Sequence, residues 1–377
     1  MRLASWLSPQ GEPRTIAAAI DSRDNSFNLV RLVAALLVVL YHASIHAPRG
    51  AGADPVSALL LPVADAGAIA VDVFFVLSGL FITQSWMRDP NVARFLARRV
   101  ARPVPGLLAC LALTTIVAVL FFSDAGVAGL ADPATWGYIF NGAALHWLRY
   151  IIPPQELALP GVLGGQPLNG PLWTVYWEGR MYVMVALIGF AAIMPMRRWM
   201  MAISLLLALC AFEFPQVLAG YVWEARLWSL FLCGMLLQTL ATEVRFGVRQ
   251  FAVACALLAL NSTRWLAVEG QTLTLVSVIL AAVTLALWVG SSRALRSRHL
   301  QQHDYSYAIY IYHWPVMLML KTMLPPMGMW GMLIATLAVV LPLSMLSWHC
   351  VESPALAWTR RRLHSGVRST IATRTGQ

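Results

Sequence analysis

The chain has 377 residues, of which 59% are hydrophobic and only 12% are charged. Globular proteins carry about 25% charged residues, so this composition excludes an ordinary soluble protein. The net charge of +10 would suit a nucleic-acid-binding protein, but the arginines lie between apolar runs and form no contiguous water-exposed face. We therefore expect an all-α, polytopic integral membrane protein that binds membrane lipids and no nucleic acid.

Ten apolar runs of roughly 17–22 residues are each long enough to cross a bilayer as a helix. They lie at residues 27–46, 66–87, 104–123, 171–194, 199–219, 223–241, 250–267, 272–290, 305–324 and 330–350. The run at 250–267 is the weakest, because polar residues interrupt it. We expect a transmembrane domain at 27–354, preceded by a cytoplasmic segment at 1–26 without the apolar core of a signal peptide, and followed by a basic cytoplasmic tail at 355–377.

Basic residues are distributed unevenly over the connecting segments. If the N-terminus is cytoplasmic, the cytoplasmic segments hold 20 of the 27 basic residues, and both termini are inside. The opposite face receives a long outer loop at 124–170, whose aromatic residues could anchor it at the membrane surface or stack on the sugar rings of a substrate. Four basic residues fall within the apolar runs: Arg31, Arg180, Arg226 and Lys321.

Arg31 and His42 stand eleven positions apart within the first apolar run. Eleven helical steps of ~100° return to within roughly 20° of the start, so the two side chains share one face, about 16 Å apart. A charge at membrane depth costs a few kcal/mol unless it faces protein or water, which makes such residues candidates for function. Snorkelling of Arg31 to the headgroups, with His42 in a helix–helix hydrogen bond, is an equally good interpretation.

Two further polar features belong to the first half of the chain. Asp72 lies within the second apolar run and needs a partner there, while the Ser78-Gly79 pair that follows permits close approach of another helix. Arg99 and Arg102 are three residues apart and share a helix face. Their guanidinium groups match phosphate oxygens, so they could bind a nucleotide-type phosphate or lipid headgroups.

The second half of the chain carries another set of polar residues at the ends of apolar runs. Glu178 and Tyr182 are separated by four residues and are expected to face the same way, close after Trp173. The ninth run opens with a dense series of hydroxyls and a histidine, and the tenth ends near Glu352, where Pro354 is expected to stop the helix. The series in the ninth run includes Ser306, Tyr310 and His313.

In this order, these motifs resemble the membrane acyltransferase-3 family, whose members acylate surface glycans and lipids in bacteria. The resemblance runs from about Ser26 to Pro354. It rests on the Arg-x10-His pair, the Phe-rich Ser-Gly segment, the Arg-x-x-Arg pair, the Trp-Glu-Tyr element, the Ser-x-x-x-Tyr element and His313. The chain departs from the family pattern at Leu80 and Met181, which replace usual aromatic residues, and at Thr174, which replaces a usual serine.

The resemblance implies an O-acyltransferase of the bacterial inner membrane that uses acetyl-coenzyme A as donor and a hydroxyl of an extracytoplasmic or lipid-linked polysaccharide as acceptor. Donor binding then falls to Arg31, Arg99, Arg102, Ser306 and Tyr310, and acceptor binding to Asp72, Trp173, Tyr182 and His313. His42 would be the general base or a transient acyl carrier, oriented by Glu178 or Glu352. We expect no metal, because the five cysteines lie in or beside apolar runs and form no C-x-x-C pair.

Two other functions fit the same residues. In a transporter or flippase for a small solute or glycan lipid, the ionisable groups in the spans would line a pathway without covalent chemistry. The absence of recognisable inverted repeats in the sequence counts against this interpretation. The chain could also be a non-catalytic assembly partner of a polysaccharide export complex, and the expected enzyme could have polysaccharide-assembly proteins as partners.

Overall fold

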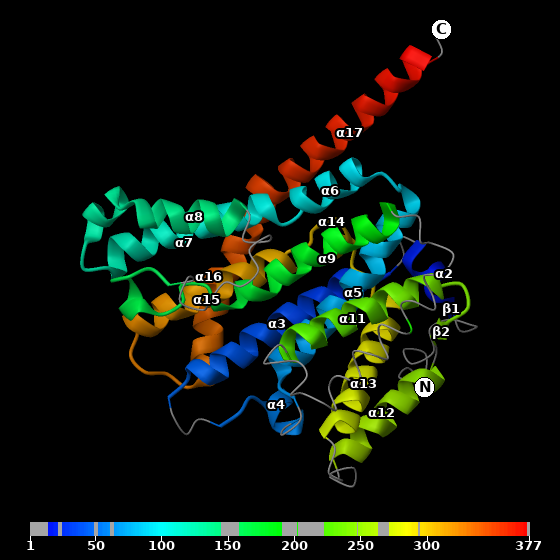
Figure 1. Ribbon diagram of the computed structural model, residues 1–377. Coiled ribbons are helices and arrows are strands. Elements are labelled where there is room, and N and C mark those ends of the chain that lie inside the picture. Colours follow the sequence, from blue (N-terminus) through cyan, green and yellow to red (C-terminus); the bar gives the residue numbers. More distant parts are fainter. Residues whose placement is uncertain are drawn as a thin grey trace. The chain divides into compact units, whose positions relative to one another are not determined.

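The computed structural model describes residues 14–21, 25–48, 52–60, 64–144, 158–190, 202, 222–246, 248–262, 271–292 and 295–374. Nearly all of the described chain is helical (Figure 1). The chain forms two compact units: unit 1 comprises Met1–Ser85 and Ala192–Ser306, and unit 2 comprises Trp86–Ala191 and Tyr307–Gln377. Each unit therefore combines helices that are far apart in the sequence.

Unit 1 is built around the first apolar run. Its elements are β1 (Arg14–Thr15), α2 (Ile16–Asp21), α3 (Phe27–His46), α4 (Pro55–Leu60), most of α5 (Ala66–Arg88), α11 (Val222–Thr239), β2 (Arg245–Phe246), α12 (Val248–Ser262), α13 (Gln271–Ser291) and α14 (Arg298–Gln302). The two short strands pair antiparallel, and α13 packs against both α12 and α3. Ser26 fastens the start of α3 to the end of α13, because its backbone N–H donates to Gly290 O (2.7 Å) and its hydroxyl to Ser292 O (2.9 Å).

Helices α5 and α11 touch backbone to backbone. A Cβ atom added at Gly79 would lie within 3.0 Å of the Phe231 carbonyl oxygen and 3.1 Å from the Gly234 Cα. At Gly234 it would meet the backbone of α5 in the same way. Only glycine fits at such a crossing, so the expectation that Ser78-Gly79 permits close helix approach is confirmed.

Unit 2 holds the remaining helices. They are α6 (Val92–Ala101), α7 (Val104–Phe122), α8 (Pro133–Ala144), α9 (Trp173–Phe190), α15 (Ser306–Met323, whose first residue belongs to unit 1), α16 (Met329–Ser347) and α17 (Ser353–Arg374), with short 3-10 turns at Gly126–Ala131, Leu163–Gly165 and Gly170–Leu172. Helix α8 packs along α7 and lies in the predicted outer loop at 124–170, which is therefore partly helical. The stretch 145–157 of this loop is outside the described residues.

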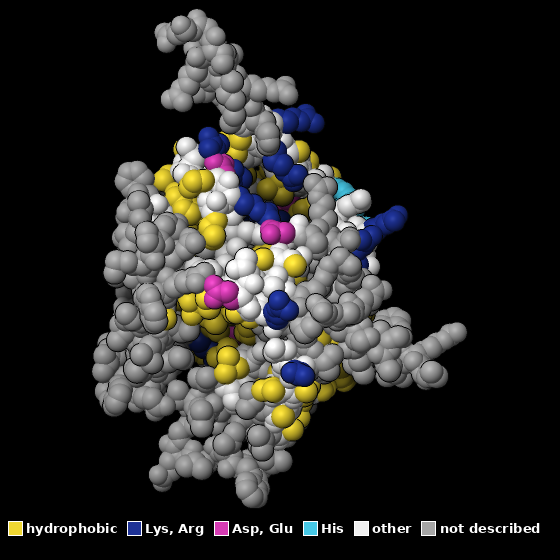
Figure 2. All heavy atoms as spheres, turned by 90° about the vertical axis from the view of Figure 1, so that its right-hand side faces the viewer, with side chains coloured by type: hydrophobic (Ala, Val, Ile, Leu, Met, Phe, Trp, Pro, Cys, Tyr) yellow, Lys and Arg dark blue, Asp and Glu magenta, His cyan; other side chains and the backbone are white. Residues whose placement is uncertain are grey.

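Four of the described helical stretches are long and apolar enough to cross a membrane: Phe27–His46, Ala66–Arg88, Val92–Phe122 and Met329–Leu363. The first has the predicted bounds. The last begins within one residue of the predicted run 330–350 and continues beyond it. The predicted runs between 171 and 324 coincide, in their described parts, with shorter or less apolar helices, except that 199–219 lies, apart from residue 202, outside the described residues. Large apolar side chains remain exposed on α16, among them Ile334 (67%) and Leu346 (60%), as expected for a lipid-facing helix. On the face in Figure 2, charged side chains occur in small groups among hydrophobic ones.

The prediction that Pro354 stops the last apolar helix is wrong. A π-helical turn, η6 (Trp348–Glu352), follows α16, and helix α17 begins directly after it at Ser353. Proline is tolerated in the first turn of a helix, where its missing N–H would have no intrahelical partner. The π turn absorbs the irregularity, and Pro354 continues the helical path as the second residue of α17.

Candidate functional site

Arg31 lies on α3, and one nitrogen of its guanidinium is engaged in an ion pair. Its NH1 donates to Asp304 Oδ2 at 3.4 Å, and its Cζ lies 5.4 Å from the centre of the Phe81 ring. The side chain is 22% exposed. Among the described residues no partner engages Nε or NH2. These donors can still bind an anion or a carbonyl oxygen.

His42 follows on the same uninterrupted helix. Because α3 is regular from Phe27 to His46, the eleven helical steps from Arg31 to His42 correspond to three turns and about 16 Å. The imidazole is half-buried, and its ring centre lies 5.3 Å from that of Tyr41. An arginine and a histidine are thus carried on one helix that is apolar enough to cross a membrane.

Asp72, which lies within an apolar run, is paired with Arg226. Both of its carboxylate oxygens accept hydrogen bonds from Arg226 of α11, from Nε at 2.9 Å and from NH2 at 2.5 Å. The Asp72 side chain is 1% exposed and that of Arg226 7%. The sequence indicated that each residue lies within an apolar run, but it could not show that these two runs cross.

Asp304 is a site residue that sequence reasoning missed. Besides Arg31, it contacts Ser306, whose hydroxyl (2.5 Å) and backbone N–H (3.3 Å) both donate to Oδ1. Ser306, one of the predicted donor-binding residues, is therefore engaged with Asp304 at the start of α15. An aspartate two residues before a helix is a recognisable capping signal, but its second partner on α3 is 273 residues away.

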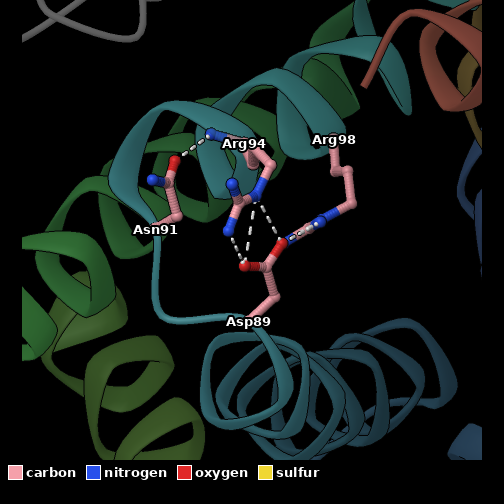
Figure 3. A network of polar contacts seen from close by, with 4 residues as sticks. All are labelled: Asp89, Asn91, Arg94 and Arg98. Atoms are coloured by element: carbon pink, nitrogen blue, oxygen red, sulfur yellow. Dashed lines mark hydrogen bonds and ion pairs between the residues drawn. The ribbon is translucent and has the colours of Figure 1, made fainter. Parts of the chain in front are cut away.

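In unit 2, the carboxylate of Asp89 holds two of the arginines of α6. Asn91 caps the helix by accepting from the Arg94 backbone N–H at 2.9 Å, and Asp89 accepts from Arg94 Nε (2.9 Å) and Arg98 NH1 (2.7 Å) (Figure 3). Hydrogen bonds from Arg94, with those from Arg98, lower the pKa of Asp89 to about 2. Two successive turns of α6 are thereby tied to one acid.

Arg99, on the neighbouring face of α6, belongs to a different group. It interacts electrostatically with Tyr182, Arg102 and Glu178, and its Cζ lies 5.7 Å from the centre of the Phe95 ring. Tyr182 is buried and hydrogen-bonded to Glu178, as the four-residue spacing predicts. Helix α6 packs against α9, which explains why these residues meet.

Glu352 reaches the same part of unit 2 through Tyr307. Glu352 is 1% exposed, and its carboxyl accepts from the Ser347 hydroxyl at 2.9 Å. Tyr307 interacts electrostatically with Glu352, Glu178 and Tyr182, while its hydroxyl donates to Pro103 O at 3.0 Å. Tyr307 is a second residue that the sequence did not single out.

Tyr310 and His313 lie in the buried part of α15. The Tyr310 hydroxyl is within 2.6 Å of the Thr174 hydroxyl and 3.0 Å of Pro171 O, so it connects α15 to the start of α9. His313 is fully buried, with Nδ1 2.6 Å from Tyr310 O. Trp173, by contrast, is 36% exposed.

Pro315 interrupts the backbone hydrogen bonds within α15. Pro315 has no N–H, which leaves the Ile311 carbonyl without its usual helical donor. Asn169 Nδ2 (2.8 Å) and Cys110 Sγ (3.3 Å) donate to it instead. Asn169 thus attaches the loop before α9 to α15, and Cys110 attaches α7 to the same carbonyl; no sequence pattern singled out either side chain.

The predicted residues therefore form two sets, one within each unit. In unit 1, Arg31, which uses one nitrogen for Asp304, and His42 lie on one apolar helix. In unit 2, arginines lie beside the Glu178–Tyr182 pair. Such sets can bind an anionic group and move a proton.

Comparison with known proteins identifies the family. An acyltransferase-3 model, described as an acyltransferase domain, matches residues 24–349. The chain is 26% identical over 364 residues to Nodulation protein 10 of Rhizobium leguminosarum bv. viciae, covering 88% of this chain and 93% of that protein. It is 27% identical over 357 residues to the O-acetyl transferase of Shigella phage Sf6, covering 90% and 98%. No solved structure matches. The chain is a membrane protein and belongs to the acyltransferase-3 family.

Proposed function

We propose that the protein transfers an acetyl group from cytoplasmic acetyl-coenzyme A to a hydroxyl of an extracytoplasmic or lipid-linked polysaccharide. The observation that carries this proposal is the arrangement on α3, where Arg31 keeps donors available and His42 lies three turns away along a helix that can cross a membrane. The O-acyl transfer named for the phage relative supports the reaction type.

In this proposal the arginines bind the donor. Arg99 and Arg102 bind phosphate oxygens of coenzyme A, for which a guanidinium fork is suited, and Arg31 binds near the thioester. Ser306 and Tyr310 assist donor binding. Trp173, which is exposed, binds the acceptor, and the buried Asp72, Tyr182 and His313 support the acceptor site without contacting solvent. No metal takes part.

His42 carries out the proton transfer. Its neutral imidazole accepts the proton of the sugar hydroxyl as the hydroxyl oxygen attacks the thioester carbonyl carbon; the new C–O ester bond forms, the C–S bond breaks, and the coenzyme A thiolate takes up the proton. A route through an acyl-imidazole on His42 has the same overall balance. The assignment of Glu178 or Glu352 as the carboxylate that orients the imidazole stays a prediction.

The protein would span the bacterial inner membrane with both termini cytoplasmic, so that the donor reaches it from inside and the acceptor from outside. Its product would pass to polysaccharide-assembly proteins. Mass spectrometry of surface glycans from a deletion strain, compared with the parent strain, would identify the acceptor.

The test uses purified protein in lipid vesicles with acetyl-coenzyme A labelled in the acetyl group and candidate bacterial glycans. Label should move to the glycan with the wild type and not with His42→Ala, while His46→Ala, a matched change in the last turn of the same helix, should retain transfer. Transfer by His42→Ala at the wild-type rate would refute the role of His42. Solute uptake without transfer would favour a transporter.

A further inference from the structure

We propose that Asp304 is the positioning residue for Arg31. Its carboxylate holds one nitrogen of the guanidinium. The other N–H groups of Arg31 can then bind acetyl-coenzyme A. This inference rests on the proposed function, in which Arg31 binds near the thioester.

The two aspartate–arginine pairs of unit 1 differ in how much of the arginine they occupy. Arg226 gives both edges of its fork to Asp72, at 2.9 and 2.5 Å, and the pair is closed to solvent. Arg31 gives one nitrogen to Asp304 at 3.4 Å and is three times as exposed as Arg226, 22% against 7%. A guanidinium has five N–H donors, so a single long contact orients Arg31 without using its binding capacity.

Asp304 is itself rigidly held. It is 6% exposed, and the Ser306 hydroxyl and backbone N–H fix its other oxygen at the start of α15. The segment just before it is fastened to the start of α3, because Asn28 Nδ2 donates to Leu300 O (2.7 Å) and Gln301 Nε2 donates to Asn25 O (3.2 Å). The carboxylate therefore stands at a defined place relative to the helix that carries Arg31.

The Phe81 ring completes the support. Arg31 Cζ lies 5.4 Å from its centre, a cation–π distance, and Phe81 is itself packed edge-on against Phe27 at 5.0 Å between ring centres. The arginine is thus bounded by an aromatic face and one carboxylate oxygen. Without the carboxylate, a long arginine side chain near the membrane surface can turn toward lipid headgroups.

Asp304→Asn is the informative change, because asparagine keeps the size and an oxygen that can accept from Ser306 but loses the charge that holds Arg31. Misplacing a supporting group commonly costs about 10- to 100-fold in activity, and we expect a loss of this size in kcat. Asp304→Glu, which keeps the charge, should recover more activity than Asp304→Asn. Asp132→Asn is the matched control, since Asp132 accepts from Ala134 N–H at the start of α8 just as Asp304 accepts from Ser306 N–H, but without an arginine.

The experiment measures kcat and KM for acetyl-coenzyme A at equal amounts of folded protein for wild type, Asp304→Asn, Arg31→Gln and the double variant. Positioning predicts that the double variant is no slower than Arg31→Gln alone, because Asp304 acts only through Arg31. Multiplicative losses in the double variant, wild-type kcat in Asp304→Asn, or an equal loss in Asp132→Asn would overturn the inference. An inactive Arg31→Gln with a fully active Asp304→Asn refutes positioning alone, whereas a fully active Arg31→Gln refutes the proposed role of Arg31 as well.

Discussion

Removing one partner of the Asp72–Arg226 pair is expected to destabilise unit 1 strongly. Arg226→Met would leave the Asp72 carboxylate, 1% exposed, without the two hydrogen bonds that compensate its burial. Breaking a buried pair in this way costs about 3–5 kcal/mol. For a unit of about 200 residues, at roughly 2–4 °C per kcal/mol, the melting temperature should fall by about 6–20 °C.

The control is the double variant Asp72→Leu with Arg226→Met. It leaves no buried charge, so it should recover most of the lost melting temperature. The assay is thermal unfolding of the purified protein in one detergent, followed by intrinsic fluorescence. A melting temperature of Arg226→Met within ~2 °C of wild type, or a double variant that is less stable than the single one, would refute this reasoning.

Two further predictions concern packing and pH. Gly79→Ala should greatly lower the yield of folded protein, because the new methyl group would overlap the backbone of α11. Gly137→Ala is the control and should leave the yield unchanged, because the nearest atom lies 3.8 Å from the added Cβ. Fluorescence-detected size exclusion measures both yields, and equal yields would contradict the close crossing of α5 and α11. The folded-state pKa of Asp89, about 2, lies below the unfolded value of about 3.9, so its stabilising effect is complete above roughly pH 4 and is lost as the pH falls toward 2. The difference in melting temperature between wild type and Asp89→Asn should therefore shrink as the pH falls from about 4 to 2. A constant difference would contradict the stabilising contacts of Asp89 with Arg94 and Arg98.

Sequence patterns predicted the helices well where length and hydropathy alone decide. The first run has the observed bounds of α3, and the glycine crossing at Gly79 was expected from residue size. The spacing of Glu178 and Tyr182 likewise predicted their contact, because neighbours on one helix face depend on local geometry only.

The failures have tertiary causes. Pro354 has the local signature of a helix end, and only the preceding π turn allows the helix to continue. Helix α8 was hidden in a segment rich in Gly and Pro, since its helix is supported by packing on α7. Asp304 and Arg226 could not be assigned to their partners, because no local pattern shows which helices meet over more than 150 residues.

The central claim is that an acetyl group passes from a donor on one side of the membrane to an acceptor on the other. The most direct measurement uses sealed vesicles in which the protein has one orientation, labelled acetyl-coenzyme A is confined to the side of the termini, and a membrane-impermeant glycan is confined to the opposite side. We predict that label appears on the glycan with the wild type and not with His42→Ala. Label that reaches the glycan only when donor and acceptor share one side would contradict transfer across the membrane.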